Sequence, residues 1–178
     1  AQHIRSSLLQ QIERMTMTFS PFLRGLLFCS TAMATVTAAQ AQDCRDYEID
    51  QTCVNSGNLP IGIVDDGAIN LTNTATGTIL GSFAAVQTWL DGEVANHGSI
   101  NSDTFGVLGF TGTLGVTNTG SIHGAAIAVI GLEAARVTNW GDLSGEFGIF
   151  SPGAVTALNY GTIAGSKASG DSYGILGD

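Results

Sequence analysis

A short motif that returns at nearly constant spacing is the feature that most constrains this chain. Residues 137–145 read VTNWGDLSG, and close copies stand at 116–124, 94–100 and 158–165. Weaker copies occupy 71–81 and 55–59. The motif glycines stand at positions 57, 77, 98, 120, 141 and 161, so the steps are 20, 21, 22, 21 and 20 residues. Self-similarity at a fixed period of this length is typical of a repeat fold, and it outranks any local assignment of secondary structure.

Each repeat alternates apolar and small polar residues. The residue two places before the motif Asn and the residue two places after the motif Gly point to the same side of an extended chain. These positions are aliphatic: Val94, Val116 and Val137, then Ile79, Ile100, Ile122, Leu143 and Ile163. Further apolar clusters follow at 83–86, 105–108, 127–130, 147–150 and 173–176. Asn and Gly both tolerate φ > 0, so Asn-x-Gly predicts a sharp corner that uses this freedom.

Such a repeat is too short to close a core of its own. Stacking it on copies of itself buries both apolar faces and pairs each strand with its equivalent one coil away. The pattern predicts an all-β parallel β-helix of about six coils of 20–22 residues, in which like lies on like. We expect one wall of the core and one corner column of hydrogen-bonded Asn side chains. Their members are Leu59, Ile79, Ile100, Ile122, Leu143 and Ile163, and Asn55, Asn73, Asn96, Asn118, Asn139 and Asn159.

Other repeat folds of similar period fit the sequence less well. A leucine-rich repeat needs a Leu-x-x-Leu-x-Leu frame, which is absent, and a Ca²⁺-binding nonapeptide roll needs repeated Gly-Gly-x-Gly-x-Asp. A β-sandwich or another all-β fold remains the alternative.

The charge of the chain restricts its partners. Beyond residue 41 there are 14 acidic residues and three basic ones (Arg45, Arg136 and Lys167), a net charge of 3 − 14 = −11. Such a surface repels phosphate backbones, so we predict no nucleic-acid partner. It also resists anionic lipid.

Residues 1–41 are predicted to be an N-terminal extension and a secretory signal peptide. Arg24 precedes the apolar stretch 25–36, and Ala39-Gln40-Ala41 is a small-x-small cleavage site. The stretch is too short and too rich in Ser and Thr to span a membrane. We therefore expect Sec-type export with cleavage after Ala41, and a cytosolic N-terminal helix is the alternative.

Two cysteines, Cys44 and Cys53, follow the predicted cleavage site. An even number of cysteines in an oxidising compartment predicts a disulfide. Closing so small a loop contributes roughly 2–3 kcal/mol at most. We expect residues 42–54 to form a disulfide-closed cap over the first coil, and residues 55–178 to form the repeats.

No catalytic, cofactor or metal site is predicted. His97 occupies an outward position between Asn and Gly, and it has no nucleophile motif beside it. The acidic residues Asp65, Asp66, Asp91, Glu93 and Asp103 are expected in loops at non-equivalent places of successive coils, as solvated turn residues. A weak Ca²⁺ site at Asp65 and Asp66 is the alternative. We predict a protein that is not an enzyme.

Trp140 and Tyr160 occupy the same outward position one coil apart. Exposed stacked aromatics could contact a sugar or a partner protein, which makes the two residues candidates for surface contact. They could equally be a neighbouring pair that stabilises the sheet.

The apolar-x-Asn-x-Gly-x-Ile-x-Gly repeat resembles the passenger domains of Gram-negative autotransporters. The motifs at 94–100, 116–124, 137–145 and 159–165 carry the resemblance, with the steps Gly106-Val107, Gly148-Ile149 and Gly174-Ile175. It implies a right-handed parallel β-helix, display or release at the cell surface, and an outer-membrane β-barrel translocator as partner. No such barrel follows in this sequence, so we expect the chain to be truncated before it.

The sequence thus predicts a surface-displayed or secreted β-helical stalk, adhesin-like, with a host or neighbouring-cell surface ligand. The alternative function is a secreted carbohydrate-active β-helix enzyme, a polysaccharide lyase or hydrolase.

Overall fold

The computed structural model describes Cys44, residues 52–166 and residues 173–177. Within these ranges every regular element is a β-strand. In the same part of the chain, no helix could cross a membrane. The predicted signal peptide and its cleavage site lie outside the described residues, as does most of the predicted cap at 42–54.

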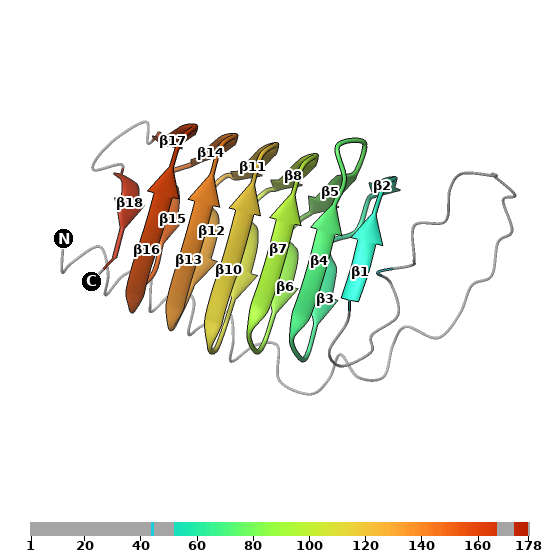
Figure 1. The fold of residues 1–178 in the computed structure, drawn as a ribbon, viewed down its shortest axis with the longest axis horizontal. Coiled ribbons are helices and arrows are strands. Elements are labelled where there is room, and N and C mark those ends of the chain that lie inside the picture. Colours follow the sequence, from blue (N-terminus) through green and yellow to red (C-terminus); the bar gives the residue numbers. More distant parts are fainter. Residues whose placement is uncertain (1–43, 45–51, 167–172, 178) are drawn as a thin grey trace, which may run out of the picture. The chain divides into compact units, whose positions relative to one another are not determined.

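The strands form three parallel sheets, and Figure 1 shows one of them in front as six strands lying side by side. The first sheet contains β1 (Thr52–Asn55), β4 (Ile69–Asn73), β7 (Gly92–Asn96), β10 (Thr113–Asn118), β13 (Ala134–Asn139) and β16 (Ala154–Asn159). The second contains β2 (Asn58–Leu59), β5 (Thr78–Gly81), β8 (Ser99–Ser102), β11 (Ser121–Gly124), β14 (Asp142–Gly145) and β17 (Thr162–Gly165). The third contains β3 (Ile63–Asp65), β6 (Ala84–Thr88), β9 (Phe105–Gly109), β12 (Ile127–Gly131), β15 (Phe147–Phe150) and β18 (Tyr173–Leu176).

Three consecutive strands make one rung, and each strand pairs with its equivalent in the next rung. The fold is therefore an all-β parallel β-solenoid of about five turns, which confirms the predicted fold class. The apolar clusters predicted from the sequence lie in the third strand of their rungs, for example at β9 and β12.

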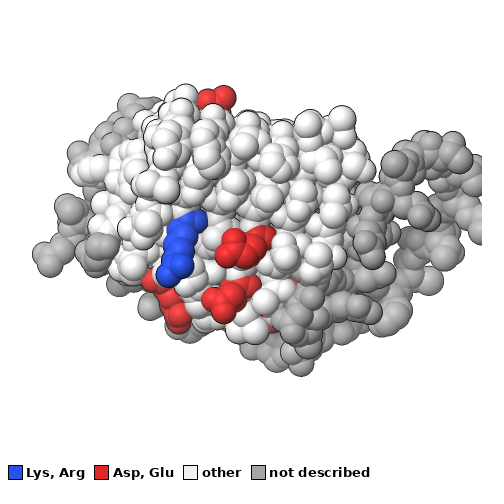
Figure 2. Space-filling view, in the orientation of Figure 1, with Lys and Arg blue, Asp and Glu red and all other residues white. Residues whose placement is uncertain are grey.

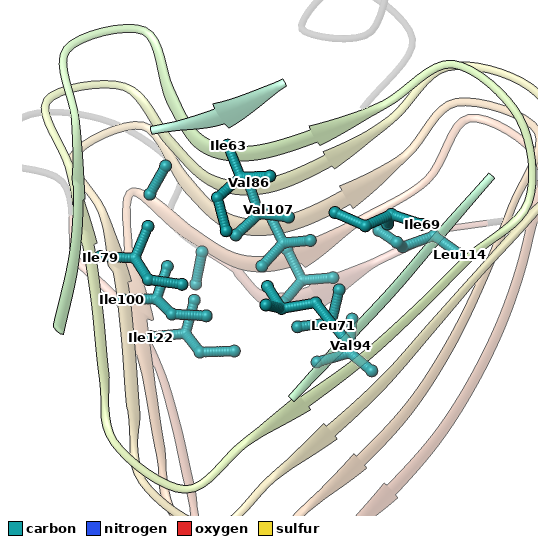
Figure 3. Packing of buried hydrophobic residues seen from close by; sticks show 14 of the residues in the cluster. Ile63, Ile69, Leu71, Ile79, Val86, Val94, Ile100, Val107, Leu114 and Ile122 are labelled. Atoms are coloured by element: carbon teal, nitrogen blue, oxygen red, sulfur yellow. The ribbon is translucent and has the colours of Figure 1, made fainter. Parts of the chain in front are cut away.

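The core consists of columns of like residues. The predicted wall from Leu59 to Ile163 is confirmed residue by residue in the register of the second sheet. Figure 3 shows Ile79, Ile100 and Ile122 of this wall in line, with their side chains pointing into the core. Two more columns face it. They run Cys53, Leu71, Val94, Val116, Val137, Ala157, and Ile63, Val86, Val107, Val129, Ile149, Ile175. Burying one such Ile or Leu stabilises the fold by about 1.5–3 kcal/mol.

The Asn column at the corner between the first and second strands is also confirmed. Each Asn amide donates from Nδ2 to the Oδ1 of the Asn one rung on, over 2.7–2.8 Å, from Asn55 through to Asn159. In the interior, Nδ2 of Asn118 also lies 3.1 Å from the Gly120 carbonyl oxygen and 3.3 Å from that of Asp142. The amide thereby joins two rungs at a buried corner where water cannot replace it.

The expectation that the corner glycines use positive φ is wrong. Among the described glycines, the left-handed region is occupied by Gly112 alone, at φ 72°. The corner requires Gly because the rungs approach closely. A Cβ on Gly141 would collide with the carbonyl oxygen of Gly120 below it, and a Cβ on Gly120 with that of Gly98. At Gly57, in the first rung, nothing lies within 4 Å of the same point.

The predicted disulfide is present at the N-terminal end of the stack. Cys44 bonds to Cys53, with 5.4 Å between the Cα atoms, and both side chains are buried. Strand β1 begins at Thr52, slightly before the predicted start of the repeats at Asn55, because Cys53 fills the inward position that Leu71 fills in the next rung. Cys53 thus belongs to the first rung.

Candidate functional site

The corner next to the Asn column presents one outward side chain per rung, and we call this set the outer corner column. Its backbone is fixed, because each member donates its N–H to the carbonyl oxygen of the Asn one rung below. For Trp140 the acceptor is Asn118, at 2.8 Å, and for Tyr160 it is Asn139, at 2.7 Å. The members that share this bond are Thr74, His97, Thr119, Trp140 and Tyr160.

Trp140 and Tyr160 are two exposed aromatic members of this column. Their rings stack with centroids 5.5 Å apart and an interplanar angle of 13°. Trp140 is 52% exposed and Tyr160 is 68% exposed. Leu158, from the neighbouring outward face of β16, is exposed as well. The structure thus places both predicted contact residues together on the surface, as an apolar patch held on a rigid backbone.

His97 is exposed in the same column, as predicted from its sequence position. Its Nδ1 lies 2.8 Å from Oγ1 of Thr119, one rung on. A second pair of this kind occurs on the second sheet, where Nδ1 of His123 lies 3.0 Å from Oγ of Ser144. A serine beside an imidazole could act as nucleophile and base, but such a pair needs a third group to orient the ring. No hydrogen bond joins His123 to a carboxylate within the described residues.

Sequence reasoning missed a second aromatic stack on another corner, between the third sheet and the first. The rings of Trp89 and Phe110 lie 4.2 Å apart between centroids at an interplanar angle of 9°. The Phe110 N–H donates to the carbonyl oxygen of Thr88, and the Thr111 hydroxyl to that of Trp89. The signal was available, because 110 − 89 = 21 is one repeat step.

Two of the predicted acidic residues bind backbone N–H groups at turns. Oδ1 of Asp91 accepts the N–H of Thr113 at 2.7 Å, and Oδ1 of Asp65 accepts the N–H of Gly67 at 2.7 Å. Asp65 ends strand β3 and Glu93 lies in β7, so the prediction that both are loop residues is wrong. In the described ranges, no three His, Cys, Asp or Glu residues are grouped so that they could hold a metal.

The face of the molecule drawn in Figure 2 is largely uncharged. It shows one basic side chain near its middle, acidic side chains beside and below that one, and another acidic side chain at the upper edge. An open depression of about 480 Å³ lies on the second sheet and its following corner, where Asn101, Asp103 and His123 line it beside Leu80. It mixes polar and apolar side chains without a buried charged group among the residues that line it.

No family model, curated protein or solved structure matches this chain.

Proposed function

We propose that this protein is a surface-displayed or secreted β-helical stalk, an adhesin-like passenger without a catalytic site of its own. The observation that carries the proposal is that equivalent residues of successive rungs stack on one another without a break, from the first described rung to the last. A repeat stack of this kind extends by adding equivalent rungs, each of which contacts only its neighbours. Such a scaffold is suited to hold a binding surface at a fixed distance from its point of attachment.

The binding surface in this proposal is the stack of Trp140 and Tyr160. Aromatic side chains offer a large contact area for few rotatable bonds, and they are enriched where proteins contact partners. Here the backbone is already fixed by the hydrogen bonds to Asn118 and Asn139, so binding requires little additional ordering. The ligand is a surface component of a host or neighbouring cell.

Export is part of the proposal. The buried disulfide between Cys44 and Cys53 suits an oxidising compartment, and the small-x-small site ending at Ala41 immediately precedes it. The autotransporter resemblance adds passage through an outer-membrane β-barrel translocator. Mass spectrometry of the exported protein is expected to give Gln42 as its first residue. An exported form that starts upstream of Met33 would contradict the predicted cleavage.

Binding is tested by incubating the labelled protein with intact Gram-negative cells and with cultured epithelial cells. The double variant Trp140→Ser/Tyr160→Ser is expected to lose at least about tenfold in affinity, which corresponds to about 1.4 kcal/mol. The matched control is Trp89→Ser/Phe110→Ser, because it removes another aromatic stack from a different corner. Unchanged binding by the first variant, or equal loss in both, would remove the assigned role.

A further inference from the structure

Four turns join the third sheet to the first, and they form another corner of the solenoid. They connect β3 to β4, β6 to β7, β9 to β10 and β12 to β13, and Figure 1 shows them side by side below the strands of the first sheet. The register of the strands places one surface side chain of each turn in a column, which we call the aromatic corner. Its members are Asp66, Trp89, Phe110 and Leu132.

The backbone around Trp89 is held on the preceding turn by hydrogen bonds. The Trp89 N–H donates to the carbonyl oxygen of Asp65 at 3.2 Å, and the Leu90 N–H donates to that of Gly67 at 3.1 Å. The buried Thr88 hydroxyl donates to the same Gly67 carbonyl oxygen at 2.8 Å. The indole is therefore presented from a fixed turn, so binding there requires little additional ordering of the protein.

The indole of Trp89 has one face covered by Phe110 and the other face directed toward Asp66. Phe110 belongs to the following rung, and its ring is nearly parallel to the indole, at an interplanar angle of 9°. The second face of the indole is therefore directed toward the preceding rung, in which Asp66 is the equivalent residue. Trp89 is 37% exposed, and Asp66 is exposed as well. The corner thus places an aromatic face and a carboxylate one rung apart, about 4.8 Å along the stack.

The charged residues of the four turns are all acidic. Besides Asp66, the side chains of Asp91 and Glu133 are exposed, and backbone N–H groups of residues 112–113 donate to both carboxylates at 2.7 Å. The turns and the residues that flank them, 65–68, 88–92, 109–113 and 131–134, contain no Lys, Arg or His. Arg136 is the first basic residue after the last turn, and it lies on the outward face of β13.

This combination of an aromatic face and carboxylates selects a cation. A Lys ammonium or an Arg guanidinium is attracted to the face of an indole, and the carboxylates attract it further while they repel an anion. Leu90 follows Trp89 in the same turn and is 50% exposed, so it offers an apolar surface to the CH₂ groups of such a side chain. A zwitterionic lipid headgroup fits less well, because its phosphate is repelled by the same carboxylates.

We propose that the aromatic corner is a docking site for a basic segment of another protein. One Lys or Arg side chain of the segment lies against the free face of Trp89 beside Asp66, and further basic side chains pair with Asp91 and Glu133. From Asp66 to Glu133 the corner covers three steps between rungs, about 14 Å. Alternate residues of an extended chain lie about 6.6–6.8 Å apart on one side. Three basic residues at alternating positions therefore match the length of the corner.

The first test is calorimetric titration of the oxidised 178-residue chain with the peptide Gly-Arg-Ser-Arg-Ser-Arg-Gly. The wild type is expected to bind it saturably, and to bind the same peptide with neutral citrulline for arginine at least about tenfold more weakly. Trp89→Leu is expected to lose at least about tenfold in affinity, and Asp66→Asn about two- to fivefold. The matched controls are Trp140→Leu and Asp142→Asn, which remove an exposed Trp and an exposed carboxylate elsewhere and should bind as the wild type does.

The second test locates the bound peptide by fluorescence. Trp140→Leu leaves Trp89 as the single tryptophan of the chain, and the arginine peptide is expected to change its emission. Adding Asp66→Asn to this variant is expected to move the midpoint of the titration to a higher peptide concentration. Circular dichroism and a melting curve show that each variant is folded.

Several results would overturn the proposal. They are a wild type without saturable binding, equal binding of the citrulline peptide, an emission of Trp89 that does not respond, and a loss in Trp140→Leu as large as in Trp89→Leu. Binding of phosphatidylcholine vesicles in preference to the peptide would overturn it as well. Neither test contains cells, so their failure leaves the proposed role of Trp140 and Tyr160 untouched. In the cell assay, Trp89→Ser/Phe110→Ser still measures whether the loss of an aromatic stack on another corner lowers binding.

Discussion

An interior rung and the last rung are built from the same motif, yet they bury very different amounts of it. Ile122 in β11 and Ile163 in β17 occupy one column of the core. Among the described residues, Ile122 has a rung on both sides and Ile163 has one on a single side. Asn118 and Asn159 differ in the same way at the corner. The residue types are thus the same in both rungs. The two rungs differ in burial and in hydrogen bonding because they have different numbers of neighbouring rungs.

The contribution of one rung to the free energy of unfolding therefore depends on how many rungs it contacts. In a solenoid, the free energy of unfolding is approximately a sum over rungs and over the contacts between adjacent rungs. Identical substitutions in the interior and at an end therefore measure the contact between rungs. Matched pairs of variants can separate the two contributions.

The largest difference is expected for the aliphatic column. Ile122→Ala removes a fully buried side chain and should lower the free energy of unfolding by about 2–5 kcal/mol. Ile163→Ala should lower it by about 1 kcal/mol, because the site is partly open and can relax. Urea unfolding followed by circular dichroism measures both. Equal losses would show that the last rung is as well covered as the interior.

The Asn column should give the next largest difference. Asn118→Ala removes the donated hydrogen bonds and also leaves Nδ2 of Asn96 without its 2.7 Å acceptor, so we expect a loss of about 2–3 kcal/mol. Asn159→Ala, at an exposed position, should lose about 1 kcal/mol or less. The same urea titration compares the two variants. A loss at Asn159 as large as that at Asn118 would contradict the expectation that an exposed Asn of the column contributes less than a buried one.

The columns could be predicted from the sequence because two periods coincide. Alternation of inward and outward residues decides that Ile79, Ile100 and Ile122 face the core, and the repeat step of about 21 residues decides that they stack. The same step would have paired Trp89 with Phe110, and His123 with Ser144. Trp89 and Phe110 were missed because they lie outside the repeat motif. His123 and Ser144 share the eighth position of the motif, but only its Asn, Gly and aliphatic positions were compared between rungs.

The role of the corner glycines could not be predicted in this way. A sequence shows that Gly141 recurs, but not whether it recurs for its backbone angles or for lack of a side chain. Only the separation of the rungs decides this, and it is the carbonyl oxygen of Gly120 that leaves no room. The sequence analysis also expected Glu93 in a loop because it is charged. Glu93 lies in strand β7 at an exposed position, since the outward face of a sheet can carry charged residues.

A smaller difference is expected at the glycines themselves. Gly141→Ala forces its Cβ against the backbone of the rung below and should cost about 1–3 kcal/mol. Gly57→Ala has open space in the first rung and should be neutral or stabilising by up to about 1 kcal/mol, because alanine restricts the unfolded chain. Thermal melting of the two variants decides between close approach and backbone angle as the cause. If both were destabilised alike, a conformational requirement shared by all corners would be the better explanation.

The smallest effect is expected at the aromatic stack, which lies outside the core. Tyr160→Ser should lower the free energy of unfolding by about 0.5–1 kcal/mol, because it removes a stacked ring that is 68% exposed. Tyr160→Phe keeps the ring and should leave stability unchanged. Urea unfolding of the two variants measures this contribution. A loss above about 2 kcal/mol for Tyr160→Ser would make the stack part of the support of the last rung. A small loss leaves the ring free to serve binding, since removing it would then alter contact with a partner without altering the fold that presents it.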